Sequence, residues 1–343
     1  MAKLKDVAEK AGVSTSTASI VINGKAELHR IAPATSRKIL QVAGKLGYLK
    51  NVRSRTTKQR ISDVIAIAFP IAETHTQTTD FWLNIVFGAN NEATKKNQNT
   101  FIIPIQDNPE ETIEHLIRYY HEGRIDAAIL PGKIAHLFKT PPEFPIVFIG
   151  PTSARIAPHL KISFKHAYFE AIKHIIEKKK TKLLWIEQEQ STLSIERFNT
   201  LRDFAEMHNL KISKIELGVY NTETILKDEG LNKISDACEK HLTTISEYDV
   251  VFCYNDIIAC GLLKAAQKNG YSIPNSFSIV GFDNLCSRFT SPRLATIDHK
   301  IVEMGAKAVN LIMRMTNSNN FNMDEWRTTT EHVDGELILG ETL

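Results

Sequence analysis

The sequence predicts an α/β protein with an N-terminal helix-turn-helix head and a two-lobed body that contains two parallel sheets. Three observations support this prediction. Residues 1–60 hold 13 Lys and Arg against 3 Asp and Glu, whereas residues 61–343 hold 29 against 36. Two short helical patterns lie close together between residues 4 and 23. From residue 61 onward, short apolar runs alternate with amphipathic segments, which is typical of parallel sheets covered by helices on both faces.

The first helical pattern ends at a glycine. Its apolar residues recur every three or four positions, as on one buried helix face, and they are Leu4, Val7, Ala8 and Ala11. Gly12 can take the left-handed conformation that ends a helix. The hydroxyl of Ser14 can then cap a second helix, which we expect to run to about Asn23.

The second helix has a buried and an outward side. We expect Ala18, Val21 and Ile22 to face the core. The remaining side chains point outward or flank the seam, and they are Thr15, Ser16, Ser19 and Ile20. Two helices joined this tightly match a helix-turn-helix, whose second helix enters the DNA major groove. An ordinary helical hairpin is the alternative, and the basic charge around the segment favours DNA binding.

A third helix is predicted after a polar loop. Pro33 suits its first turn, Gly47 ends it, and its apolar face consists of Ile39, Leu40, Val42, Ala43 and Leu46. The loop before it carries Lys25, His29 and Arg30, which either contact DNA phosphates or decorate the surface. Residues 50–61 are rich in Lys and Arg and have no apolar period, so we interpret them as a linker that follows a head of residues 1–49.

The body shows about eight apolar strands and six helices. The predicted strands cover residues 61–70, 100–105, 127–130, 146–149, 182–186, 214–217, 250–253 and 278–282. The predicted helices cover residues 81–97, 110–122, 167–178, 195–208, 256–269 and 301–315. This length exceeds one comfortable sheet, so two lobes are expected. Ligands bind beyond the carboxyl ends of parallel strands, which places Pro70, Gly150, Asn255 and Asp283 near any site.

Other features of the sequence exclude several classes of protein. No apolar run approaches the ~20 residues of a membrane span, and the first twenty residues lack the apolar core of a signal peptide. We therefore expect a cytoplasmic protein, associated with the nucleoid when it binds DNA. The four cysteines form no C-x-x-C pair, so neither a zinc site nor a disulfide framework is indicated. No glycine-rich phosphate loop follows a predicted strand and no catalytic set presents itself, so we expect no cofactor and no enzymatic activity.

Several longer motifs together carry a family resemblance. They are DVAEKAGVSTSTASIVIN, LGYLKN, GRIDAAIL, SIERFNTLRDF, VVFCYNDIIACG, IPNSFSIVGFDN and SPRLATIDHKIVEMGAKAV. With them the chain resembles the LacI/GalR (lactose repressor) family of transcriptional regulators over essentially its whole length. The longer loop in NGKAELHRIAPAT is similar to the fructose- and sucrose-regulator branch. The resemblance implies a periplasmic-binding-protein-like body, a homodimer on a pseudo-palindromic operator, and a sugar or sugar-phosphate effector that controls genes of carbohydrate use.

The resemblance also implies which residues contact DNA. Thr15, Ser16 and Ile20 match the base-facing positions of the recognition helix, and Ile20 can make only apolar contacts, for instance with a thymine methyl group. The full set of expected DNA-binding residues is Thr15, Ser16, Thr17, Ile20, Asn23, Lys25, His29, Arg30, Asn51, Arg53 and Arg55. Thr57 stands where relatives carry a leucine that wedges into the minor groove. We therefore predict weaker operator bending than is usual in the family.

For the effector, the resemblance points to one cleft between the lobes. Phe81 and Trp82 match positions that line this cleft, where aromatic rings stack on a sugar or a base. Arg197, Asn255 and Asp283 match polar pocket positions, although each also has an ordinary structural role open to it: a surface residue, a helix cap and a turn former. Relatives have an Asp-Asn pair where this chain has Ser163 and Phe164, so one wall gains an aromatic ring and loses polar contacts. Three basic residues nearby either bind an anion or belong to a solvated helix start, and they are Lys161, Lys165 and His166.

The predicted domains follow from these motifs. The first lobe is expected to comprise residues 62–158 with about 295–319, and the second lobe residues 159–294 with about 320–343. The last residues lack the apolar heptads of a tetramerising coiled coil, so a dimer is expected. The main alternative function is a cytoplasmic small-solute-binding protein with weak or non-specific DNA binding. A nucleotide-dependent enzyme is disfavoured by the missing phosphate loop.

Overall fold

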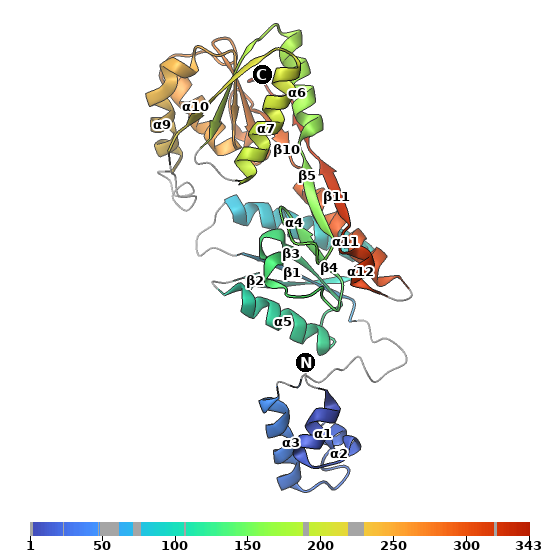
Figure 1. Cartoon of the computed structure of the whole chain (residues 1–343). Coiled ribbons are helices and arrows are strands. Elements are labelled where there is room, and N and C mark those ends of the chain that lie inside the picture. Colours follow the sequence, from blue (N-terminus) through green and yellow to red (C-terminus); the bar gives the residue numbers. More distant parts are fainter. Residues whose placement is uncertain are drawn as a thin grey trace.

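The computed structural model consists of a small helical head and a larger two-lobed body (Figure 1). The structure describes residues 3–22, 24–46, 48, 62–70, 77–105, 108–187, 192–218, 230–318 and 321–343. The head contains three helices, α1 (Leu4–Ala11), α2 (Thr15–Ile22) and α3 (Pro33–Lys45). Their shared core consists of Val7, Ala8, Ala11, Ala18, Val21, Ile39 and Ala43.

The turn between α1 and α2 has the predicted geometry. Gly12 ends α1 with a φ of 71°, in the left-handed region, and its N–H donates to the carbonyl of Glu9. The hydroxyl oxygen of Ser14 accepts a hydrogen bond from the backbone N–H of Thr17 at 3.0 Å. A side-chain oxygen that caps a helix in this way satisfies one of its free N–H groups. The helix-turn-helix prediction is therefore confirmed.

Two side chains of the head do not lie where the sequence predicts. Ser19 is buried and not outward, because α2 packs against both α1 and α3 and so buries a wider arc than one stripe. Leu40 is 54% exposed, although it was expected in the core. It lies one residue, or about 100° of helix rotation, beyond the buried Ile39. Gly47, the predicted end of α3, is outside the described residues.

The first sheet of the body has six parallel strands in the order β11-β5-β4-β3-β1-β2. They are β1 (Val64–Pro70), β2 (Asn99–Ile105), β3 (Ala127–Pro131), β4 (Ile146–Ile149), β5 (His159–Ser163) and β11 (Thr330–Asp334). Successive side chains of β1 alternate between two cores, since Ile65 and Ile67 join one cluster and Ala66 and Ala68 the other. Both faces are therefore covered, as the apolar runs predict.

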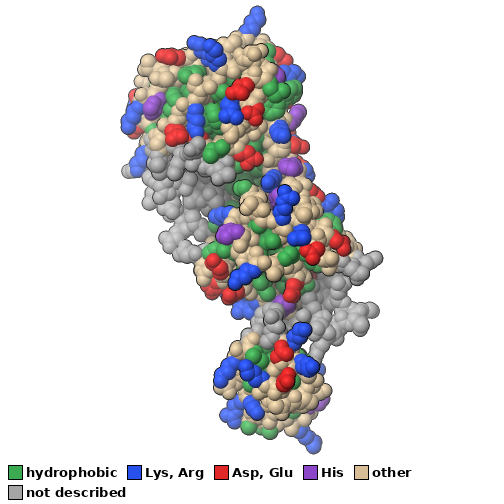
Figure 2. All heavy atoms as spheres, viewed as in Figure 1, with side chains coloured by type: hydrophobic (Ala, Val, Ile, Leu, Met, Phe, Trp, Pro, Cys, Tyr) green, Lys and Arg blue, Asp and Glu red, His purple; other side chains and the backbone are tan. Residues whose placement is uncertain are grey.

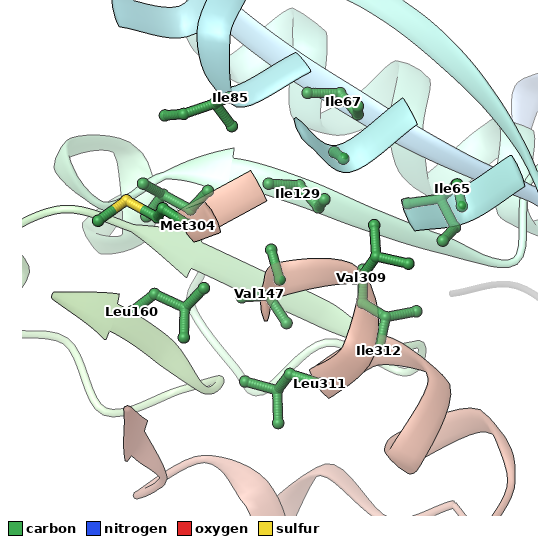
Figure 3. Close-up of a cluster of buried hydrophobic side chains, with 14 of the residues drawn as sticks. Ile65, Ile67, Ile85, Ile129, Val147, Leu160, Met304, Val309, Leu311 and Ile312 are labelled. Carbon is green, nitrogen blue, oxygen red and sulfur yellow. The ribbon is translucent and has the colours of Figure 1, made fainter. Parts of the chain in front are cut away.

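Helices α4 (Gln77–Lys95) and α11 (Ile301–Thr316) cover one face of this sheet, and α5 (Pro109–His121) covers the other. Figure 3 shows Ile85 of α4 and Met304 and Val309 of α11 over the sheet residues Ile129 and Val147. The two helices approach closely at glycines. A Cβ atom on Gly305 would lie 2.1 Å from the carbonyl oxygen of Ile85, so any larger residue would force α4 and α11 apart.

The second sheet also has six strands, in the order β12-β10-β9-β8-β6-β7. They are β6 (Lys182–Glu187), β7 (Lys211–Glu216), β8 (Val250–Cys253), β9 (Ser278–Phe282), β10 (Ala295–Asp298) and β12 (Glu336–Ile338), of which β12 alone runs antiparallel among the described pairs. One face is covered by α6 (Lys165–Glu177) and α7 (Thr192–Met207) and the other by α9 (Gly230–Ile245) and α10 (Asp256–Lys268). The short elements η2 (Gly132–Leu137), η3 (Ser287–Phe289) and α12 (Met323–Trp326) complete the described fold.

The chain passes between the two lobes at three places, and these differ from the predicted boundaries. Strands β5 and β11 lie side by side in the first sheet, and β10 belongs to the second (Figure 1). The predicted division at residues 158, 294 and 320 is therefore corrected to crossovers near residues 164, 299 and 335. The reason is that HLKIS, ATID and TEHVD are too short and too polar to be recognised as strands, yet each pairs with a neighbour in the fold.

Two further expectations concern cysteines and membranes. All four cysteines are free thiols; Cys238 and Cys253 are buried, and the sulfur atoms of Cys260 and Cys286 lie 3.3 Å apart. Burial raises the pKa of the Cys238 thiol to about 12. Within the described part of the chain, no helix combines the length and the apolar character that a bilayer crossing requires.

Candidate functional site

The head presents its predicted reading residues on the outward side of α2. Thr15 and Ser16 are exposed, and Thr17 and Ile20 are partly exposed, opposite the buried Ala18. Thr17 also takes part in the helix cap, because its hydroxyl lies 2.8 Å from that of Ser14. The side of α2 that is available to a DNA groove therefore carries short polar groups and one aliphatic side chain.

Basic side chains surround this helix. Lys25, His29 and Arg30 are exposed on the loop between α2 and α3, and Arg30 adopts a left-handed φ of 52°. Figure 2 shows several Lys and Arg side chains on the visible face of the head. Such groups can neutralise DNA phosphates. The other predicted DNA contacts, Asn23, Asn51, Arg53 and Arg55, lie outside the described residues.

The body contains a cavity of about 420 Å³ that is lined from both lobes. It is lined by all six predicted effector residues, which are Phe81, Trp82, Phe164, Arg197, Asn255 and Asp283. Gly150, which follows β4, lines it as well, whereas Pro70 is not among its lining residues. Of the basic residues expected nearby, Lys161 lines the cavity, and Lys165 and His166 are exposed on the first turn of α6.

One wall of the cavity is aromatic and belongs to the first lobe. The rings of Phe69 and Trp82 stack with centres 6.0 Å apart, and Phe81 meets Trp82 edge-on at 5.8 Å. Since Trp82 is anchored in the core beneath α4, its position is fixed by the fold. Across the cavity, Phe164 is buried at the start of α6 and packs edge-on against Phe282 at 5.1 Å. Of these rings, Phe81, Trp82 and Phe164 line the cavity and offer flat apolar surface on two sides of it.

The polar floor of the cavity is centred on Arg197, which is only 3% exposed. Its Nη1 donates to the carbonyl of Tyr254 at 2.8 Å, and its Nη2 lies 3.7 Å from Oδ1 of Asp283. The guanidinium also rests on the ring of Phe282, with Cζ 3.8 Å from the ring centre. The sequence left open a surface role for Arg197, and burial excludes it.

Asn255 and Asp283 occupy the ends of neighbouring strands. The side chain of Asn255 caps α10, because its Oδ1 accepts a hydrogen bond from the backbone N–H of Ile258 at 2.9 Å. Asn255 also lines the cavity, so it has both the structural role and the position in the site that the sequence left open. Asp283 directly follows β9 and has a φ of 106°, a conformation that is strained for any residue other than glycine. Strain of this kind is often found at functional sites.

His299 is a cavity residue that the sequence reasoning missed. Its Nε2 lies 2.7 Å from Oδ1 of Asp283, and its ring meets Phe282 and Phe81 edge-on. Burial lowers the pKa of His299, although Asp283 opposes this shift, so the ring is neutral at pH 7. The short Nε2 to Oδ1 distance requires a proton between the two atoms, and Nε2–H is therefore the donor. The signal in the sequence was a histidine directly after the strand residues in TIDH, but the sequence pattern does not predict β10 as a strand.

Comparisons with known proteins agree with this architecture. Residues 3–51 match the model of bacterial regulatory proteins of the lacI family, and residues 172–338 match the periplasmic-binding-protein-like domain. The HTH-type transcriptional repressor PurR of Mannheimia succiniciproducens is 26% identical over 352 residues, which covers 100% of this chain and 99% of that protein. PurR of Histophilus somni is 28% identical, with 92% of each chain covered.

Solved structures share the fold at lower identity. The transcriptional regulator CelR in its cellobiose complex superposes with a TM-score of 0.61 at 18% identity, with both chains fully covered. A LacI family regulator from Arthrobacter in complex with lactose superposes with a TM-score of 0.63 at 18% identity, and the match covers 81% of this chain and 98% of that chain. The matched models thus assign to this chain a lacI family helix-turn-helix head at residues 3–51 and a periplasmic-binding-protein-like body, which together form the architecture of a transcriptional regulator.

Proposed function

We propose that this regulator is a repressor of carbohydrate-utilisation genes whose operator affinity is set by a sugar or sugar phosphate bound between the lobes. The observation that carries the proposal is the cavity, in which Phe81 and Trp82 of the first lobe face Arg197 and Asp283 of the second. A ligand that contacts both walls favours one angle between the lobes. Among the described residues the chain passes between the lobes at three places, and a ligand that bridges the lobes can shift their relative orientation about these crossovers as about a hinge.

The class of effector follows from the chemistry of the lining. Aromatic rings pack on the apolar face of a sugar, and Arg, Asn and Asp side chains bind pairs of hydroxyl groups. Two of the structural neighbours described above are complexes, one with cellobiose and one with lactose. The loop between α2 and α3, which is similar to that of the fructose and sucrose regulators, agrees with a carbohydrate-linked role.

A homodimer is the form in which this change in lobe angle would reach DNA, since two heads spaced by the bodies can read two half-sites. The first lobe offers an apolar surface for a second copy. Leu83 and Phe87 of α4 are exposed, with Phe87 at 59%, and so is Ile102 of the edge strand β2, which shares its face of the sheet with Thr100. The two elements are tied together by the hydrogen bond between Thr100 and Asn90 at 2.8 Å. Exposed apolar groups that gather on one side of a molecule usually mark a protein interface.

The alternative is a small-solute-binding protein with weak or non-specific DNA binding. Operator selection from a random DNA pool, followed by mobility-shift assays over a range of salt, separates the two. The proposal requires one enriched pseudo-palindrome that binds at least about 10³-fold more tightly than random DNA. Equal affinity for every sequence, together with tight sugar binding, would favour the alternative. We place the protein in the cytoplasm, at the nucleoid when bound, because its operator lies there, and we assign it no catalytic activity.

A further inference from the structure

We infer that the cavity is built for an uncharged effector, so that a free sugar binds and its phosphate ester is rejected. The inference rests on the proposed effector function and narrows it. A cavity that selects phosphate needs uncompensated cations or several convergent N–H donors, because a phosphate dianion must replace the water it loses. The arrangement of charges on the floor of this cavity does not provide them.

Among the described residues that line the cavity, the buried cation is Arg197, and it is already neutralised. Nη1 of Arg197 is used by the carbonyl of Tyr254 at 2.8 Å, and Nη2 lies 3.7 Å from the carboxylate of Asp283. One face of the guanidinium is covered by the ring of Phe282. An incoming phosphate would therefore meet a buried ion pair, and not a free positive charge.

The carboxylate of Asp283 itself opposes an anion. It is buried, it lines the cavity, and it contacts Arg197 and the uncharged His299. At this depth solvent screens like charges weakly, so a second anion beside Asp283 is strongly disfavoured. The remaining charged lining groups are Lys133 and Glu196, which are exposed, and Lys161, which is half-buried. Hydrated side chains of opposite sign do not make a phosphate site.

What the floor does offer suits a hydroxyl group. Nε of Arg197 and Nδ1 of His299 are buried and have no hydrogen-bond partner among the described residues. Because Nε2 of His299 holds the proton, Nδ1 is an acceptor, whereas Nε of Arg197 is a donor. A hydroxyl both donates and accepts, so neighbouring hydroxyls on a sugar ring can satisfy both atoms. The rings of Phe81, Trp82 and Phe164 then cover the apolar faces of that ring.

The test removes the neutralising carboxylate and uses inorganic phosphate as the probe. In Asp283→Asn the charge of Arg197 is no longer compensated. We expect this variant to bind phosphate at about millimolar concentration, measured by calorimetry at constant ionic strength, and at least about ten-fold more tightly than the wild-type protein. Asp236→Asn, at an exposed carboxylate on α9 of the same lobe, is the matched control and should behave like the wild type. The double variant Asp283→Asn, Arg197→Met should lose the gained binding.

Saturable phosphate binding by the wild-type protein, or no gain in a folded Asp283→Asn protein, would overturn the inference. Should that variant fail to fold, the wild-type protein is titrated with matched pairs, fructose against fructose 1-phosphate and glucose against glucose 6-phosphate. Tighter binding of a phosphorylated member would refute the inference, and a preference of at least about ten-fold for the free sugar would support it. Operator binding in a mobility-shift assay reports separately on the regulator function. A failure of the present inference can therefore be distinguished from a failure of the proposed function.

Discussion

The carboxylate of Asp256 accepts a hydrogen bond from the hydroxyl of Thr296 at 2.6 Å, and both residues are fully buried. The other carboxylate oxygen accepts from the backbone N–H groups of Leu285 and Cys286 at 2.9 and 3.4 Å. Asp256 starts α10, and the two N–H groups belong to the loop that follows Asp283. This one side chain therefore fixes the loop that carries the acidic floor of the cavity.

Asp256 should make stability depend on pH in a defined window. Burial raises the pKa of this carboxyl from 3.8 to about 7, so between these values the folded protein keeps a proton that the unfolded chain releases. The resulting stability is present at low pH and is lost as the pH rises towards 7. The free energy of unfolding of the wild type relative to Asp256→Asn should fall by up to about 1.4 kcal/mol per pH unit and level off above pH 7. Urea unfolding at a series of pH values tests this, and a difference that rises with pH would contradict it.

The cap of the recognition helix should matter for the stability of the head. Replacing Ser14 with Ala removes the acceptor for the Thr17 N–H and should destabilise the head by about 1 kcal/mol. The control is Ser16→Ala, because Ser16 is exposed and lies two residues after Ser14. This variant should change the free energy of unfolding by less than about 0.5 kcal/mol. Thermal unfolding followed by circular dichroism measures both variants. Equal losses of stability in Ser14→Ala and Ser16→Ala would argue against a specific helix cap at Ser14.

The loop after the recognition helix should contribute to DNA affinity through charge. Lys25→Ala should weaken binding to operator DNA and to random DNA to a similar degree. It should also reduce the slope of log affinity against log salt concentration by about 0.9. Ile20→Ala should instead act mainly on the operator, because its only expected contact is apolar and base-specific. Binding isotherms at several salt concentrations separate these effects. An unchanged salt slope in Lys25→Ala would mean that this side chain only decorates the surface.

The apolar surface on α4 gives a direct test of the dimer. Phe87→Asp places a charge in the proposed interface and should yield monomers that bind the full operator at least about ten-fold more weakly. Met207→Asp is matched to it, because Met207 is a 73% exposed apolar residue at the end of α7, in the other lobe. Sedimentation velocity should show a dimer for the wild type and for Met207→Asp. Dimers in the Phe87 variant would place the interface elsewhere.

The sequence predicts the cavity better than it predicts the boundaries of the lobes. The six effector positions implied by the family resemblance all line one cavity. Of the four positions that the strand-end rule placed near a site, Gly150, Asn255 and Asp283 line it and Pro70 does not. The lobe boundaries depend on β5, β10 and β11, which are only four or five residues long and contain polar residues, so they leave no apolar run to detect. Helix α9 is different, because Ile234, Cys238, Leu242 and Ile245 have helical spacing and the signal was overlooked.

His299 shows why the floor of the cavity could not be read completely from sequence. A single histidine after a short strand resembles many buried structural histidines. Its role depends on the 2.7 Å contact with Asp283, sixteen residues earlier in the chain, and on the Phe81 ring from the other lobe. Such contacts arise only when three crossovers bring the lobes together. The predicted weak bending by the segment around Thr57 stays a prediction, because those residues lie outside the described part of the chain.

The most direct test of the account is the affinity for the selected operator with and without an effector found by a thermal-shift screen of sugars. We predict that saturating effector changes the operator Kd by about 5- to 150-fold. Phe81→Ala, which removes one aromatic wall of the cavity, should shift this response to higher effector concentration. An effector that binds the cavity and leaves the operator Kd unchanged would contradict the central claim that the cavity controls the head.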